Sequence, residues 1–255
     1  MNNQSIILSI LTLLIYINSF IYSYYGLFLA NISIKNILKC VPAAILVLYS
    51  FVLICYHQAS NNTYARNMSC CLTVIYTFCV IGDSLLLVDD NIFTAVATIF
   101  FMLVYLILGF MNFFAISHEA NPNSREKLYI NISAFLYFIF FLFILAIINV
   151  KVNNTAEFTF MFIYLSIILL SINLSTYKFI ICKNNQQGYF LVGMLSLAVS
   201  DILLLLNMAF IHKLLINVFV INIYWLGLLY IAYATKFFDE SNIIYSRLYP
   251  PYINI

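Results

Sequence analysis

Long apolar stretches separated by short polar breaks run along nearly the whole chain. A helix needs about 20 mainly apolar residues to cross the hydrocarbon core of a bilayer, and the recurring runs predict about eight such helices. The predicted spans are residues 6–28, 41–56, 68–88, 92–117, 128–150, 158–182, 189–210 and 214–238. We therefore expect an all-α polytopic transmembrane helical bundle that forms a single transmembrane domain over residues 1–255, with a short polar tail at residues 239–255.

The composition excludes a soluble protein. Apolar residues make up 65% of the chain and charged residues 8%, whereas a soluble domain carries about a quarter charged residues. The breaks between spans leave no room for a soluble domain, and the first apolar run is too long for a signal peptide. The net charge of +2 is small and dispersed, so no nucleic-acid partner is expected.

The Lys and Arg residues near the span ends predict the orientation, because positive loops stay preferentially in the cytosol. The side that holds both termini carries seven of them: Arg66, Arg125, Lys127, Lys178, Lys183, Lys236 and Arg247. The opposite side carries four: Lys35, Lys39, Lys151 and Lys213. This difference favours cytosolic termini.

Six cysteines lie mostly within the apolar runs: Cys40, Cys55, Cys70, Cys71, Cys79 and Cys182. They form no C-x-x-C pair, and no His stands at metal-ligand spacing from them. We therefore expect buried, unreactive thiols and neither a metal ion nor another cofactor. The vicinal pair Cys70 and Cys71 leaves acylation or redox chemistry open as an alternative.

Two of the nine acidic residues, Asp83 and Asp201, stand inside predicted spans. An Asp at the centre of a membrane helix costs about 2.5 to 3.5 kcal/mol on insertion scales, so the two together cost about 5 to 7 kcal/mol. Intramembrane carboxylates face the bundle interior and are functional by default, which makes both residues candidates for acid–base catalysis. The alternative is that they only join helices through hydrogen bonds to Ser, Tyr or Asn.

The sequences around the two aspartates are similar. They read Gly82-Asp83-Ser84-Leu85-Leu86-Leu87 and Ser200-Asp201-Ile202-Leu203-Leu204-Leu205. The two sites lie four spans apart, so both helices run in the same direction, and a parallel repeat of four plus four helices would give them comparable depth. Tyr76 shares the helical face of Asp83, and Ser200 and Asn207 add polar groups near Asp201, so these three are candidate substrate-binding residues.

Two intramembrane aspartates are also found in membrane aspartyl proteases, where the carboxylates share a proton. Those proteases resemble Y-D in one helix and G-x-G-D in another, followed by a P-A-L segment. Here Val80 replaces the first Gly before Gly82 and Asp83, Asp201 follows Ser200, and no P-A-L segment occurs. We therefore set this class aside.

Three short motifs occur together in this chain: Lys39-Cys40-Val41-Pro42, Gly82-Asp83 with its apolar tail, and Ser200-Asp201-Ile202-Leu203-Leu204-Leu205-Leu206-Asn207-Met208-Ala209-Phe210. In this combination, over roughly residues 5–238, the chain resembles the YhhN-type lysoplasmalogenase family of eight-span membrane proteins. The family's seventh-span motif reads S-D-x-x-L-x-x-N-K-F, so the Lys is replaced by Met208 and one residue is inserted before Phe210. Tyr105 stands at the His of the family's F-x-x-A-H-x-x-Y motif, and residues 224–228 lack the Gln of Y-Y-x-A-Q. The alternative of a non-catalytic lipid-binding family member rests on these departures.

The resemblance implies hydrolysis of the vinyl-ether bond of a lysoplasmalogen, which releases a fatty aldehyde and a glycerophospho-base. Asp83 and Asp201 would be the catalytic residues. Protonation of the vinyl ether creates an oxocarbenium ion that water captures, which is close to glycoside hydrolysis by two carboxyl groups. The implied partner is a lysophospholipid within the bilayer, and the implied location is the endoplasmic reticulum membrane.

Two further residues complete the predicted substrate site. Lys39 is the candidate cation for the lipid phosphate, although it could equally snorkel to the interface, and Tyr105 is included through its motif position. Most of the 20 Tyr and 24 Phe are expected to be lipid-facing or interfacial. The alternative functions are a lipid or small-molecule transporter with buried carboxylates, and a non-catalytic lipid-binding protein.

Overall fold

Eight long helices make up the fold. The computed structural model describes residues 3–25, 32–60, 62–88, 91–116, 122–150, 152, 154–207 and 214–237. The helices are α1 (Asn3–Tyr24), α2 (Ile32–Ala59), α3 (Thr63–Leu85), α4 (Asn91–Ile116), α5 (Ser124–Asn149), α6 (Thr155–Cys182), α7 (Asn185–Leu206) and α8 (Leu214–Ala234), followed by the 3₁₀ turn η3 (Thr235–Phe237). All eight are long and apolar enough to cross a membrane. The predicted all-α polytopic fold is confirmed, whereas the predicted tail at 239–255 lies outside the described residues.

The largest difference from the predicted spans is at α2, which begins at Ile32 instead of residue 41 and continues through Pro42. A proline inside a helix has no N–H to donate, so the carbonyl of the fourth residue before it loses its partner. That carbonyl belongs to Leu38, and it accepts a hydrogen bond of 3.0 Å from the side-chain amide of Asn18 in α1. Neighbouring side chains commonly satisfy such freed backbone groups in membrane helices, so Pro42 does not end α2.

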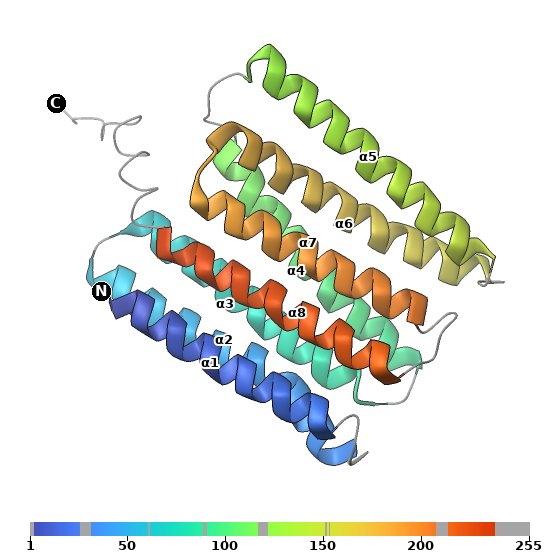
Figure 1. The fold of residues 1–255 in the computed structure, drawn as a ribbon, viewed down its shortest axis with the longest axis horizontal. Helices are drawn as coiled ribbons and strands as arrows, with labels where there is room; N and C mark the ends of the chain where they lie inside the picture. Colours follow the sequence, from blue (N-terminus) through green and yellow to red (C-terminus); the bar gives the residue numbers. More distant parts are fainter. Residues whose placement is uncertain are drawn as a thin grey trace.

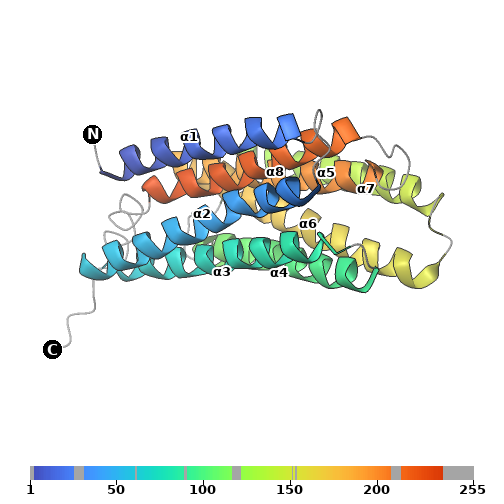
Figure 2. The same cartoon turned by 90° about the horizontal axis from the view of Figure 1, so that it is seen from below.

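Successive helices run antiparallel, and α1 begins at the end of the bundle where α8 ends (Figure 1). The neighbour relations close a ring of seven helices in the order α1, α2, α3, α4, α6, α7 and α8, which returns to α1. In the view of Figure 2 the helices run across the picture, with α1 and α8 along one side of the bundle and α3 and α4 along the other. Helix α5 lies outside the ring and packs on α6.

The arrangement of the helices agrees only in part with the predicted four-plus-four repeat. Helices α3 and α7 run in the same direction, as a four-plus-four repeat requires. In such a repeat α1 and α5 would occupy equivalent places, yet α1 packs between α2 and α8 whereas α5 packs mainly on α6. The two halves of the bundle are therefore not equivalent.

Helices α7 and α8 pack most closely, at a pair of glycines. A Cβ placed on Gly193 would lie 2.6 Å from Ile231 Cγ1 and 2.9 Å from the carbonyl oxygen of Gly227. A Cβ on Gly227 would in turn lie 3.0 Å from the carbonyl oxygen of Gly193. Small residues of this kind let two membrane helices approach each other through their backbones.

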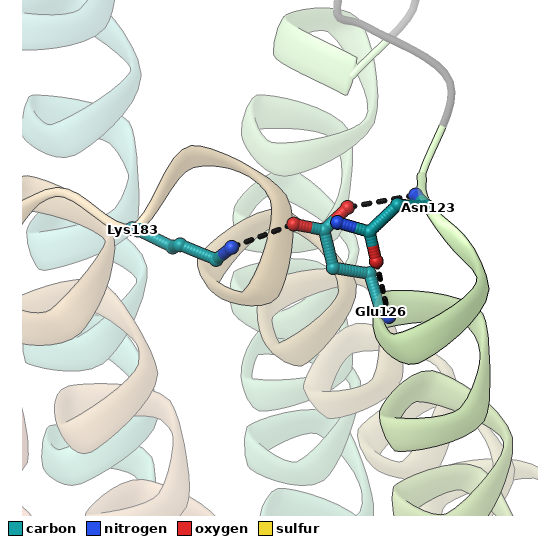
Figure 3. Close-up of polar contacts among 3 residues, drawn as sticks. All are labelled: Asn123, Glu126 and Lys183. Carbon is teal, nitrogen blue, oxygen red and sulfur yellow. Dashed lines mark hydrogen bonds and ion pairs between the residues drawn. The ribbon is translucent and has the colours of Figure 1, made fainter.

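The start of α5 is attached to the corner between α6 and α7 (Figure 3). Asn123 and Glu126 form a capping box that satisfies backbone N–H groups at the helix start. The second Glu126 oxygen accepts a hydrogen bond of 2.6 Å from Lys183 Nζ. Lys183 ends α6 in the left-handed region with φ of 49°, which turns the chain directly into α7. Since the side chain of Lys183 is 65% exposed, this ion pair contributes little to stability.

Candidate active site

The two intramembrane carboxylates lie toward the same end of the bundle. Asp83 lies two residues before the end of α3 and Asp201 five residues before the end of α7, and these helices run in the same direction. Neither carboxylate lies at the centre of its helix, the position for which the insertion cost given above applies. Asp83 is nevertheless only 2% exposed, and Asp201 is partly buried. Because insertion costs fall toward the ends of a span, the two residues are cheaper to insert than the helix-centre values predict.

Asp83 faces a cation on the neighbouring helix α2. Its Oδ1 atom lies 3.6 Å from Nζ of Lys39, whose side chain is 16% exposed. Its Oδ2 atom is buried and forms no hydrogen bond within the described part of the chain. The hydroxyl of Tyr224 in α8 also falls short of regular hydrogen-bond geometry, but it lies beside Asp83 and Cys79 and is a potential donor to both. Asp83 therefore has one oxygen beside a positive charge and one that forms no regular hydrogen bond in the described part of the chain but has the Tyr224 hydroxyl nearby.

Asp201 is held by two tyrosines from two other helices. Its Oδ2 atom accepts hydrogen bonds from Tyr105 Oη of α4 at 2.8 Å and from Tyr164 Oη of α6 at 2.5 Å. The two rings meet edge to face with 6.2 Å between their centroids. Ser171 of α6 also donates a hydrogen bond of 2.8 Å to the backbone carbonyl of Tyr105. This contact between α4 and α6 fixes the tyrosine that reaches Asp201.

The two carboxylates belong to one cluster. The charge of Asp201 reaches Asp83, although it acts on Asp83 more weakly than Lys39 does. The buried thiol of Cys79, one helical turn before Asp83, interacts electrostatically with both carboxylates and also with Tyr224. These groups come from α3, α7 and α8, while Lys39, Tyr105 and Tyr164 add α2, α4 and α6. The interior of the ring thus gathers polar groups from six of its seven helices.

The Gly82–Asp83 pair has a packing reason for its glycine. A Cβ on Gly82 would lie 2.9 Å from Cζ of Phe101, a residue of α4. The Phe101 ring in turn meets the Tyr224 ring edge to face, with centroids 6.3 Å apart. Gly82 therefore lets Phe101 fill the space between the Asp83 turn of α3 and Tyr224 of α8.

Three of the predicted substrate-binding residues are not directed at the two carboxylates. Tyr76 donates a hydrogen bond of 3.4 Å to the backbone carbonyl of Leu228. Asn207, at the end of α7, donates one of 2.6 Å to Asn217 Oδ1 near the start of α8. Ser200 is buried, but it precedes Asp201 in the helix and so projects about 100° away from it.

Two of the cations used to predict orientation are interior groups instead of loop groups. Lys39 is directed at Asp83, and Lys178 lies within α6 and is 4% exposed. Lys178 is buried and Lys39 is only partly exposed. Without these two the comparison becomes six cations against three, which still favours cytosolic termini.

No pattern in the sequence distinguishes Tyr164, Tyr224 or Cys79 as site residues. Tyrosines were expected to be mostly lipid-facing or interfacial, and Tyr16, for example, is 71% exposed. Tyr105, Tyr164 and Tyr224 are all buried, however, and they line the carboxylate cluster. Each lies in a continuous apolar run, so no spacing or charge pattern distinguishes it from the other tyrosines.

Comparison with protein-family models supports the resemblance inferred from the motifs. The model of the YhhN family matches residues 34–235, about four fifths of the chain. The matched range includes both aspartates, Lys39, Tyr105, Tyr164 and Tyr224. Searches of curated proteins and of solved structures gave no match.

Proposed function

The chain belongs to the YhhN family, and from this premise we propose that it is a membrane-embedded hydrolase that cleaves the vinyl-ether bond of lysoplasmalogens. The products would be a fatty aldehyde and a glycerophospho-base. The observation that carries the proposal is the pair of interacting carboxylates with different surroundings inside one helical ring. Acid-catalysed ether hydrolysis requires one carboxyl group that gives a proton and one carboxylate that handles water.

Asp201 is suited to remain the carboxylate. Two hydroxyl donors on one oxygen stabilise a negative charge, as two donors do in an oxyanion site. The tyrosines also fix the direction of the second carboxylate oxygen. We therefore assign to Asp201 the activation of water and the stabilisation of the cationic intermediate.

Asp83 is suited to be the proton donor. Its Oδ2 atom has no hydrogen-bond partner among the described residues, so this oxygen is available to carry a proton. Lys39 at 3.6 Å balances the carboxylate when no substrate is bound. Once a lipid phosphate takes over Lys39, Asp83 is left without its cation, and a buried carboxyl without a cation is more stable with its proton. Asp83 therefore takes up one proton from solvent as the lipid binds and releases it when the products leave and Lys39 returns.

The proposed reaction balances in protons and bonds. Asp83 transfers its proton to the β-carbon of the vinyl ether, and the double bond becomes an oxocarbenium ion. Asp201 accepts a proton from water as the water oxygen bonds to the α-carbon, which gives a hemiacetal. Asp201 then returns its proton to the ether oxygen as the carbon–oxygen bond breaks, while Asp83 takes the hydroxyl proton. The aldehyde and the alcohol leave, and both carboxyl groups regain their starting states.

A single-chain lipid fits the position of the site. Each of the eight helices exposes large apolar side chains, along which an alkyl chain could lie. The carboxylates lie near one end of the helices and Lys39 lies next to them, which suits a phosphate near the interface and a vinyl ether slightly deeper. Lysoplasmalogens place these two groups at opposite sides of one glycerol unit.

The proposal is tested by incubating purified protein in detergent micelles with a lysoplasmalogen and measuring free aldehyde. We expect aldehyde and glycerophospho-base in equal amounts, and none from the double variant Asp83→Asn, Asp201→Asn. Folded wild-type protein that binds the lipid without cleaving it would contradict the hydrolase. Lipid flux into liposomes driven by a pH gradient, again without cleavage, would favour the transporter.

A further inference from the structure

We propose that Asn18 of α1 is a positioning residue for the active site, acting through the broken hydrogen bond of α2. The catalytic role of Asn18 rests on the proposed function. Its hydrogen bond to the Leu38 carbonyl does not depend on that function. In this proposal Asn18 replaces the missing N–H of Pro42 and thereby holds Lys39 against Asp83.

The segment just before Pro42 packs against the end of α3 through two consecutive side chains. Lys39 Nζ lies 3.6 Å from Asp83 Oδ1, and Cys40 Sγ lies 3.6 Å from the hydroxyl of Ser84. Adjacent residues of α2 therefore face adjacent residues of α3. A small change in the direction of this segment moves both pairs together.

Pro42 leaves this segment without its normal restraint. The carbonyl of Leu38 would otherwise accept the backbone N–H of residue 42, and the proline ring also crowds it. Leu38 directly precedes Lys39, so the orientation of the Leu38 peptide group sets the direction in which the Lys39 side chain leaves the helix. A proline here gives a point where α2 can bend.

Asn18 supplies the replacement from a different helix. Its Nδ2 atom donates to the Leu38 carbonyl at 3.0 Å, and the residue is 6% exposed. Leaving a buried carbonyl without a donor costs more than an ordinary hydrogen bond contributes. Other polar side chains of α1 bond to α8 instead: Thr12 shares a hydrogen bond of 2.8 Å with Tyr233, and Ser19 donates to Asn222. Asn18 thus links α1 to the bend of α2.

A disulfide-forming pair tests the geometry without using activity. The substitution Ser84→Cys places a second thiol beside the Cys40 thiol, and mass spectrometry after mild oxidation gives the rate at which the two sulfurs join. We expect the added change Asn18→Leu to slow this rate about tenfold, because the segment before Pro42 loses its restraint. The matched control Thr12→Val removes a hydrogen bond of α1 to α8 and should change the rate less than twofold.

A Pro42→Ala background decides whether Asn18 acts through the Leu38 carbonyl. Pro42→Ala returns a backbone N–H that can bond to the Leu38 carbonyl, so Asn18→Leu should then slow disulfide formation less than twofold. An equal slowing by Asn18→Leu with and without Pro42 would overturn the proposal, since Asn18 would then not act through this carbonyl. If Asn18→Leu alone folds poorly, the Pro42→Ala background still allows the test, because it restores the backbone hydrogen bond to the Leu38 carbonyl.

Aldehyde release provides the second measurement. We expect Asn18→Leu to raise KM about tenfold with a smaller change in kcat, and Pro42→Ala to remove most of that effect. If wild-type protein releases no aldehyde, the proposed function fails, while the disulfide rates still decide whether Asn18 holds the segment before Pro42 against α3. If Asn18→Leu slows disulfide formation but leaves KM unchanged, the positioning role is wrong and the hydrolase stands.

Discussion

Asp83 and Asp201 lie in similar sequence motifs on parallel helices, yet they are held in opposite ways. Asp83 has a cation at one oxygen and, at the other, no regular hydrogen bond from the described residues, whereas one oxygen of Asp201 receives two tyrosine hydroxyls. The difference arises because the partners come from other helices. Similar local sequence therefore gives two carboxyl groups with distinct surroundings, and distinct surroundings are what a pair with two roles in acid catalysis requires.

Replacing each carboxyl group by its amide tests this comparison most strongly. We expect Asp83→Asn to lower kcat about 10³-fold, because it removes the proton donor. Asp201→Asn keeps an acceptor for the two tyrosines but loses the charge, so we expect about a 10²-fold loss. Steady-state aldehyde release from folded variants gives both values. Equal losses would remove the distinction between the two residues, and a larger loss at Asp201 would reverse the assigned roles.

Removing the hydroxyl donors sharpens the Asp201 side of the comparison. Tyr105→Phe and Tyr164→Phe should each lower kcat about tenfold, because one donor remains on the same oxygen. The double variant should lose more than the product of the two, since the carboxylate then has no described donor. Tyr76→Phe, which removes a long hydrogen bond to the Leu228 carbonyl, is the control and should change kcat less than twofold.

Removing the cation sharpens the Asp83 side. Lys39→Met keeps the length of the side chain and loses its charge, so KM for lysoplasmalogen should rise about tenfold. An alkenylglycerol without phosphate should show no such rise, because it offers Lys39 nothing to bind. A KM increase of the same size for both substrates would mean that Lys39 acts only by holding Asp83.

The smallest expected effect concerns the contact that holds the Asp201 helix against the Tyr224 helix. Gly193→Ala places a Cβ within 2.6 Å of Ile231 and 2.9 Å of the Gly227 backbone, and we expect it to lower the free energy of unfolding by about 1 to 3 kcal/mol. Gly188→Ala on the same helix meets only Phe179, at 3.5 Å, and should be neutral. Unfolding in mixed micelles measures both variants, and equal stability would show that α7 and α8 can move apart without cost.

The sequence predicts the helices of this protein well because span length is a direct physical requirement of the bilayer. It also singles out Asp83 and Asp201, since a carboxylate within an apolar run is costly and rare. Lys39 was recognised as a cation near the site through its motif. Its partner Asp83 became visible only when α2 and α3 were packed side by side.

Other features could not be predicted because lipid is as apolar as the interior of the bundle. Helix α5 has the same apolar character as the ring helices, so nothing in its sequence shows that it packs outside them. Tyr164 and Tyr224 are hidden for the same reason, because a buried tyrosine and a lipid-facing one occupy similar apolar runs. The start of α2 is predicted too late because the span rule counts only the apolar run, which begins after the charges of Lys35 and Lys39, whereas the helix itself begins at Ile32.

The order of the helices has a consequence for how the protein is made. Membrane proteins are synthesised from the N-terminus, so Lys39 is made before Asp83, and Tyr105 and Tyr164 are made before Asp201. Each aspartate is thus synthesised after the side chains that contact it in the folded protein. The nascent chain therefore does not have to expose an aspartate to lipid before its partners are present. A circular permutant that begins at α3 would reverse this order for Asp83 and should insert less efficiently.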